Sequence, residues 1–288
     1  MKPAPFTYHR ARSAEDATRL LTELGNEAKL LAGGQSLIAM MNYRLARPSH
    51  LIDIGSLPPS ERMTGLRPGA DGLRIGALTT HHAVETADPA RLGPGFAVLR
   101  DAMRWVGHLP IRTRGTIGGS IAHGDSTAEW CLLAVLLDAH IVAQGPRGTR
   151  SIRAGDFFHG FFTTALDPDE LITEVVFPRL APYAALTEFA ERKGDFAIVA
   201  VAVDLDVEGG AVRGGRVALG GVAPAPVRVP EAELELARGG PASALFVACA
   251  EAAAAAIDPP GDHNGSPRYR RALTRTLVRR ACEEAMAR

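Results

Sequence analysis

The 288-residue sequence predicts an α+β fold in two domains. In the first part of the chain, strand-like apolar runs and helical patterns are mixed, whereas in the last part strands come first and helices follow. Two prolines interrupt the pattern within 178–182, directly after a strand-like run. Because paired prolines break regular structure, we place the boundary there and expect domains at 1–178 and 179–288.

The first domain opens with clear helix and strand signals. Ser13, with Asp16 three positions later, predicts an N-capped helix over 14–24, and Gly25 ends it. The run KLLAGG predicts a short strand that leads straight into a glycine turn. Further strands are expected at 51–54, 73–78, 140–145, 149–154 and 170–178, and further helices at 96–106 and 128–138. His81 and His82 are expected to open another helix as surface or capping residues.

The second domain shows a simpler pattern. Residues 196–223 alternate between apolar runs and Gly-rich breaks, which predicts antiparallel strands joined by tight turns. An alanine-rich helix is expected within 241–258, because alanine has the highest helix propensity. A last helix is expected from Pro267 to the end of the chain.

The composition excludes several classes of partner and site. Thirty-two basic residues balance thirty-two acidic ones, so we expect no nucleic-acid partner. Cys131, Cys249 and Cys282 are too few for an iron–sulfur cluster and form no disulfide framework. The first residues lack the apolar stretch of a secretory signal, and no run is long enough to span a membrane. We therefore expect a soluble, cytoplasmic protein.

The sequence contains two glycine-rich turns, each preceded by an apolar run and ended by a residue with a hydroxyl group. They are centred on Gly33, Gly34, Gln35 and Ser36, and on Gly115, Thr116, Gly118, Gly119 and Ser120. Bare main-chain N–H groups in such turns can cradle a diphosphate without a lysine or a metal. The pair therefore suggests one extended dinucleotide held from two sides.

Other readings of these turns are weaker. Neither turn ends in the GK[ST] of a Walker loop or follows GxGxxG. Ser36 lies in GGQSL rather than GxSxG, so it does not match a nucleophile elbow. A single glycine pair is more often a plain turn, and that alternative remains open for each turn taken alone.

Several segments taken together resemble a known family. They are AGGQSL, MNYRLARPSHLIDI, IRTRGTIGGSIAHGDSTAEW and RKGDFAIVAVA. In combination they resemble the FAD-binding medium subunit of the molybdenum hydroxylases, the xanthine dehydrogenase and carbon monoxide dehydrogenase family. The resemblance implies a FAD-binding domain of the vanillyl-alcohol-oxidase type with two α+β lobes, at about 1–55 and 56–178. A small C-terminal domain of the carbon monoxide dehydrogenase flavoprotein type would follow, with a three-stranded antiparallel sheet and helices.

The resemblance also implies which residues hold the flavin. The expected contacts of the first turn are Leu31, Ala32, Gly33, Gly34, Gln35, Ser36 and Leu37, and those of the second are Thr116, Gly118, Gly119 and Ser120. Glu129, and more weakly Asp125, would accept hydrogen bonds from ribose or ribityl hydroxyls. An acid at a helix N-terminus, favoured by the helix dipole, is the plain alternative for Glu129.

Two further contacts come from later segments. Ile172 would pack on the isoalloxazine ring, or serve simply as core, and Lys193 lies in a segment that approaches the flavin edge in relatives. Some relatives carry a lysine where this chain has Glu188. No catalytic base and no metal ligand is expected in this chain.

The function implied is that of an electron-transfer subunit. Substrate would be oxidised at a molybdenum-pterin cofactor in a large subunit. Electrons would pass through [2Fe–2S] clusters of a small iron–sulfur subunit to FAD here, then to an external acceptor. The complex would be a dimer of heterotrimers. The alternatives are a self-contained FAD-dependent oxidase or dehydrogenase of the same fold, which would need a larger substrate domain, and a non-catalytic binding module, which would have degenerate glycine turns.

Overall fold

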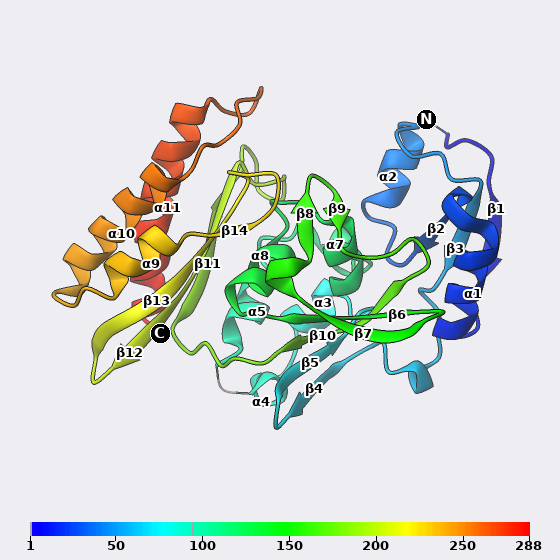
Figure 1. Ribbon diagram of the computed structural model, residues 1–288, viewed down its shortest axis with the longest axis horizontal. Helices are drawn as coiled ribbons and strands as arrows, with labels where there is room; N and C mark the ends of the chain where they lie inside the picture. The colour runs from blue at the N-terminus through cyan, green and yellow to red at the C-terminus, as the bar shows by residue number, and fades with distance from the viewer. Residues whose placement is uncertain (1, 94) are drawn as a thin grey trace.

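A three-stranded parallel sheet begins the chain in the computed structural model, which describes residues 2–93 and 95–288 (Figure 1). Its order is β1 (Thr7–Arg10), β3 (His50–Asp53) and β2 (Ala28–Leu31). Helix α1 (Ala14–Leu24) connects β1 to β2, and the Ser13 hydroxyl caps it by accepting from the N–H of Asp16, as predicted. The first glycine turn follows β2 and runs into the short helix α2 (Leu37–Asn42).

A five-stranded antiparallel sheet forms the middle of the molecule. Its order is β4 (Leu66–Gly69), β5 (Gly72–Gly76), β10 (Leu171–Phe177), β6 (His140–Gly145) and β7 (Gly148–Arg153). Within the described residues between β5 and β6 the chain forms α3 (His81–Glu85), α4 (Pro89–Leu92), α5 (Ala97–Ala102), α6 (Leu109–Arg112), α7 (Ile117–His123) and α8 (Glu129–Leu136). The small hairpin β8 (Phe158–Gly160) and β9 (Thr163–Thr164) precedes β10. Single 3-10 turns lie at Gly25–Glu27, Pro59–Glu61 and Ala154–Asp156.

Two predicted elements of this part are shorter in the structure. The helix expected at 96–106 ends at Ala102, and Gly107, with φ +46°, turns the chain a few residues later. The strand expected at 73–78 ends at Gly76, because the N–H of Ala77 donates to Thr173 outside the ladder. The helix predicted at 128–138 is confirmed as α8 and is almost wholly buried.

A second antiparallel sheet carries the C-terminal part. It has the order β11 (Ala184–Phe189), β12 (Val199–Glu208), β13 (Ala211–Gly220) and β14 (Val227–Arg228). The expected three strands are therefore corrected to four. The additional strand pairs through only two residues and lies among prolines. It is therefore too short to show the alternation of apolar and polar residues that predicts a strand. Helices α9 (Pro230–Leu236), α10 (Ala242–Ala256) and α11 (Pro267–Met286) cover its outer face (Figure 1).

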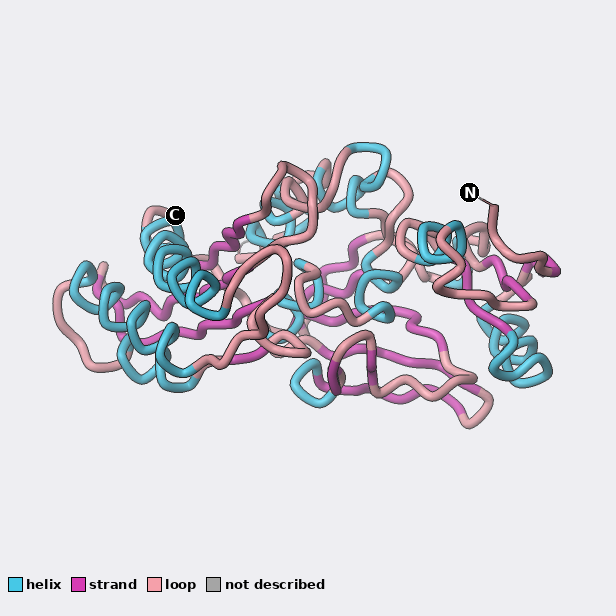
Figure 2. The backbone as a smooth tube through the Cα atoms, turned by 90° about the horizontal axis from the view of Figure 1, so that it is seen from above, coloured by secondary structure: helices cyan, strands magenta, loops and turns pink. Residues whose placement is uncertain are grey.

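The C-terminal sheet has two apolar faces. Ala200 and Ala202 of β12 belong to the core shared with the middle part, where α8 packs on β12 and β13. Val201 and Val203 belong to a second core under α10 and α11. The period of two along β12 therefore fixes this sheet between the middle part and its own helices. Figure 2 shows the first sheet and the C-terminal helices at opposite ends of the molecule. Among the described residues, no helix has both the length and the apolarity to cross a membrane.

Candidate functional site

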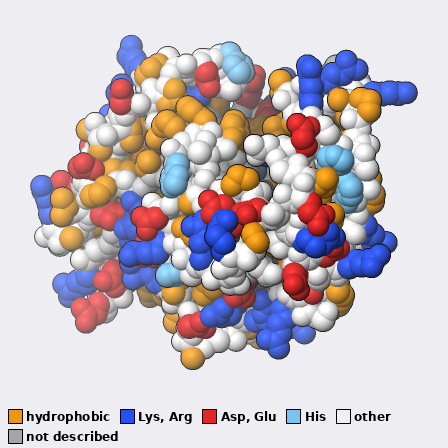
Figure 3. All heavy atoms as spheres, turned by 45° about the vertical axis from the view of Figure 1, so that its right-hand side comes forward, with side chains coloured by type: hydrophobic (Ala, Val, Ile, Leu, Met, Phe, Trp, Pro, Cys, Tyr) orange, Lys and Arg blue, Asp and Glu red, His pale blue; other side chains and the backbone are white. Residues whose placement is uncertain are grey.

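One large cavity lies between the first sheet and the middle part, and both glycine turns line it. Its volume is about 860 Å³, which is in the range of sites for large cofactors. Figure 3 shows the surface hollowed in this region, with hydrophobic side chains beside the hollow. Every predicted binding residue except Lys193 lines the cavity: Leu31, Ala32, Gly33, Gly34, Gln35, Ser36, Leu37, Thr116, Gly118, Gly119, Ser120, Asp125, Glu129 and Ile172.

The two turns touch each other at Gly33. A Cβ atom placed on Gly33 would lie 2.1 Å from the carbonyl oxygen of Arg114 and 2.8 Å from Cα of Gly115. No side chain fits in that space, so the contact requires glycine. The next residue, Gly34, has φ +73°, a conformation that glycine adopts without strain. Sequence-distant segments thus meet backbone to backbone at the cavity wall.

The first turn offers free donors. Among the described residues, the main-chain N–H groups of Gly33, Gly34, Gln35 and Ser36 donate to no protein acceptor. The Ser36 hydroxyl does not cap α2 and is likewise uncommitted. The Gln35 amide donates to the carbonyl of Gly33 (3.1 Å) and so braces the turn from within. Four amides and a hydroxyl of residues that line the cavity are therefore available to an anion.

The second turn works differently from the prediction, because its glycine amides already donate within the protein. The N–H of Gly118 donates to Ala77 O (2.8 Å), that of Gly119 to Thr116 Oγ1 (3.1 Å), and that of Ser120 to Thr116 O (3.0 Å). A Cβ on Gly118 would lie 2.5 Å from that of Ala77. The glycines of this turn therefore allow α7 to pack closely rather than supply free donors.

Glu129 and Asp125 occupy one side of the cavity. The Asp125 carboxylate accepts from the N–H and hydroxyl of Thr127 (2.9 and 2.8 Å), which orders the turn before α8. Glu129 is the first residue of α8, so it is both a cavity residue and a helix N-terminal acid. Burial, with the charge of Asp125 adding to it, raises the pKa of Glu129 to about 7.

Glu188 lies behind Glu129 rather than in the cavity wall. It is 7% exposed on β11, and its Oε2 has no hydrogen-bond partner among the described residues. It pairs across the ladder with Ala200, so it points towards the core shared with the middle part. Burial and the charge of Glu129 raise the pKa of Glu188 to about 9, and the carboxyl is protonated at neutral pH.

Two predicted contacts in later segments have different outcomes. Ile172 lines the cavity from β10 and is 5% exposed. Lys193 is exposed and does not line the cavity, although the residues after it, 194–197, do. Gly194 has φ +80°, and a Cβ there would lie 2.8 Å from His108, so the chain turns tightly just after Lys193. That turn leaves the lysine side chain outside the cavity.

His81 was expected at the surface, and that expectation is wrong. It is 5% exposed, and Thr80, not His81, caps α3. The indole N–H of Trp130 donates to Nδ1 of His81 (2.9 Å), and the imidazole lines the cavity. Burial, reinforced by the charge of Arg112, lowers the pKa of His81 to about 4. The sequence gives no local signal for this contact, because 49 positions separate the two rings.

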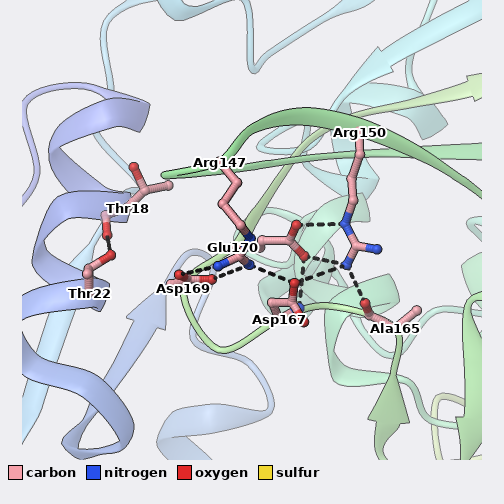
Figure 4. Close-up of polar contacts among 8 residues, drawn as sticks. All are labelled: Thr18, Thr22, Arg147, Arg150, Ala165, Asp167, Asp169 and Glu170. Atoms are coloured by element: carbon pink, nitrogen blue, oxygen red, sulfur yellow. Dashed lines mark hydrogen bonds and ion pairs between the residues drawn. The ribbon is translucent and has the colours of Figure 1, made fainter.

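A charged network holds the loop before β10 at the cavity rim (Figure 4). Arg150 donates twice to the nearly buried carboxylate of Glu170 (2.7 Å each), and Arg147 pairs with Asp167 (2.7 Å) and Asp169 (3.1 Å). Asp167 and Glu170 also line the cavity. The hydrogen bond from Arg150 lowers the pKa of Glu170, which stays ionised. Among the described residues, no cluster of histidine, cysteine or acidic side chains could hold a metal ion.

Comparisons with known proteins match the whole chain. Residues 4–180 match the model of the FAD binding domain in molybdopterin dehydrogenase, and residues 184–285 match that of the CO dehydrogenase flavoprotein C-terminal domain. The chain is 39% identical to the 6-hydroxypseudooxynicotine dehydrogenase complex subunit alpha of Paenarthrobacter nicotinovorans, covering 100% of this chain and 97% of that one. A carbon monoxide dehydrogenase chain from Hydrogenophaga pseudoflava, solved without the Mo-pyranopterin moiety, superposes with a TM-score of 0.93 at 36% identity over 100% and 99% of the two chains. Quinoline 2-oxidoreductase from Pseudomonas putida 86 gives a TM-score of 0.93 at 32% identity, with the same coverage.

Proposed function

Because the chain belongs to the FAD-binding medium subunits of the molybdenum hydroxylases, we propose that it carries FAD in the cavity between its first sheet and middle part. It receives electrons from the [2Fe–2S] clusters of a partner subunit and passes them to an external acceptor. The observation that carries this proposal is the turn Gly33–Ser36, whose four free amides face the cavity where the two glycine turns touch.

The residues present fit this cofactor. The diphosphate lies on the amides of the first turn and the Ser36 hydroxyl, with Leu31–Leu37 around it and Thr116–Ser120 as the opposite wall. Asp125 and Glu129 face the ribityl or ribose hydroxyls, and Ile172 packs on the flavin ring. In the segment expected at the flavin edge, we propose residues 194–197, which line the cavity, as the flavin contacts in place of Lys193.

The work of this chain is binding and positioning. Bound FAD supplies an electron carrier that takes electrons singly and can release them in pairs. The protein orients it with main-chain donors and excludes water with an apolar wall, and it needs no general base of its own. The substrate is oxidised elsewhere in the complex, so the chain carries electrons and does not select the substrate.

The proposed assembly is a heterotrimer with a large molybdopterin-binding subunit and a small iron–sulfur subunit, paired into a dimer of heterotrimers. Relatives that this chain covers along their whole length are subunits or medium chains by name, which supports this over a self-contained oxidase. Three free, buried cysteines fit a reducing compartment, and we place the complex in the cytoplasm. We keep the domain boundary at 178/179, supported by the two apolar cores and by family models that end at 180 and begin at 184.

Flavin content and flavin reduction test this function. The purified chain, incubated with FAD and desalted, is expected to retain about one flavin per chain by absorbance. The substrate of the complex should bleach that absorbance only when the large and small subunits are present. A chain that retains no flavin would overturn the proposal, and bleaching by substrate in the isolated chain would favour a self-contained enzyme.

A further inference from the structure

The imidazole of His81 presents one ring nitrogen to the cavity in a fixed protonation state. Its Nδ1 accepts the indole N–H of Trp130 (2.9 Å), and the two rings meet edge to edge, with centroids 6.5 Å apart and planes inclined by 27°. A nitrogen that accepts a hydrogen bond carries no proton, so the proton of the neutral ring lies on Nε2. Trp130 therefore sets the tautomer.

The Nε2–H donor has no partner in the protein. Among the described residues it makes no hydrogen bond, although His81 is more than nine-tenths buried. Nε2 is not among the fully buried unpaired side-chain atoms of the described residues, so it is reachable from the cavity and available to an acceptor on a ligand. Gly115 keeps this donor uncovered, because a Cβ at that position would lie 2.6 Å from Nε2.

The position of Gly115 suggests which part of a ligand this donor meets. On one side Gly115 contacts Nε2 of His81, and on the other its Cα lies against Gly33, whose own amide is free. Both sets of donors therefore converge around a single glycine. Burial, reinforced by the charge of nearby Arg112, lowers the pKa of His81 to about 4, so the donor is a neutral imidazole at neutral pH.

We propose that Nε2–H of His81 donates a hydrogen bond to a diphosphate oxygen of bound FAD, with Trp130 as the residue that positions it. This inference rests on the proposed function. It adds to the main-chain cradle a side-chain donor that comes from outside both glycine turns.

Two variants and a matched control test the donor. His81→Ala is expected to weaken FAD binding about 10- to 100-fold in titration calorimetry, as for loss of a hydrogen bond to a charged group. His81→Gln, whose amide can reach the Nε2 position, should recover part of that loss. His82→Ala, at the half-buried neighbour that bonds Glu85 and does not line the cavity, should bind FAD like the wild type. Equal affinity in His81→Ala and wild type would overturn the inference.

Nitrogen NMR of the wild-type chain locates the contact without a variant, and phosphorus NMR of His81→Ala adds a second measurement. In the wild type, the 15N signal of Nε2 should show a protonated nitrogen before and after FAD is added, and its proton should move downfield on binding. In His81→Ala the 31P signals of bound FAD should shift, while the flavin absorbance spectrum stays unchanged. A spectrum that changes at the flavin ring but not at phosphorus would contradict a diphosphate contact. Failure of the wild type to bind FAD would instead contradict the proposed function.

Trp130→Phe tests the positioning residue separately. This substitution keeps an aromatic ring but removes the N–H. The 15N signals should therefore show a mixture of the two neutral tautomers of His81, one with the proton on Nδ1 and one with the proton on Nε2. FAD binding should weaken several-fold, less than in His81→Ala. An unchanged tautomer in Trp130→Phe would show that Trp130 does not set it.

Discussion

Gly33 is the residue on which the contact between the two turns depends most directly. Its Cα–H faces the carbonyl of Arg114 with no room for a methyl group. The sequence identified Gly33 as a turn residue through its neighbours Gly34 and Ser36. It did not identify Arg114 as the partner, because that contact is made between backbones and leaves no mark on side-chain type.

Gly33→Ala should separate the turns and lose flavin. The Cβ would lie 2.1 Å from a carbonyl oxygen, so the turns must move apart and the four amides lose their alignment. We expect FAD retention to fall at least tenfold in desalting assays. Gly155→Ala is the matched control, because nothing lies within 4 Å of a Cβ there. Full flavin content in Gly33→Ala would show that the contact does not support the site.

Glu188→Gln should raise the free energy of unfolding at neutral and alkaline pH but not at acidic pH. The pKa of Glu188 in the folded protein, about 9, exceeds its ordinary value, so folding becomes less favourable as pH rises from about 4.5 towards 9. A neutral glutamine avoids this loss. We expect Glu188→Gln to unfold in urea with a free energy about 2–4 kcal/mol higher than wild type at pH 8, and with no gain at pH 4. Glu191→Gln, at an exposed position, is the control, and an equal gain at both pH values would contradict the burial argument.

Several site residues could not be read from sequence for a common reason. The burial of His81 depends on Trp130, and that of Glu188 depends on the face of β11 that turns towards the middle part. Both are contacts between distant segments. Lys193 is the opposite case, a residue that the sequence predicted at the site but that lies outside the cavity. A motif indicated a place near the flavin, whereas the turn at Gly194 leaves the lysine exposed.

Among the elements, the loop before β10 is held by charge rather than by apolar packing. Glu170 is 7% exposed, and without Arg150 its buried carboxylate would keep only the hydrogen bond from the N–H of Asp167. The same loop forms part of the cavity rim. Its order should therefore matter both to stability and to the rate of FAD release.

Arg150→Ala should loosen this loop. We expect a loss of about 2 kcal/mol in unfolding free energy at pH 7, because the carboxylate loses both hydrogen bonds. The loss should shrink below about pH 4, since Arg150 stabilises the ionised form of Glu170 and lowers its pKa. FAD release, followed by flavin fluorescence, should be faster. Arg153→Ala, exposed on the same strand, is the control, and identical release rates in both variants would contradict the role of the network.

Elements with strong periodicity were predictable, and irregular ones were not. Helix α1, helix α8 and the hairpin β12–β13 follow from caps, apolar density and the turn at Gly209–Gly210. Strand β14 and helix α6 are too short for a period to appear. Their conformations depend on the strands and loops they pack against.

At the scale of the whole molecule, the first sheet and the middle part enclose the cavity, and the C-terminal sheet is fixed to the middle part by small residues. Ala200, Ala202 and Ala218 face α8 and its surroundings, and Gly220 lies against the turn before α8, where a Cβ would be 2.6 Å from Ser126 O. The sequence predicted both the α+β class and the dinucleotide between two turns. It could not predict that, among the described residues, the glycine amides of the second turn donate within the fold while those of the first turn stay free, because that depends on the strand end at Ala77.

Amide hydrogen exchange of the full chain with and without FAD tests the binding mode most directly. FAD should slow exchange strongly at the amides of Gly33–Ser36, which have no protein acceptor, and only weakly at Gly118–Ser120, which already donate within the fold. Unchanged exchange at Gly33–Ser36 in a chain saturated with FAD would contradict the placement of the diphosphate on the first turn.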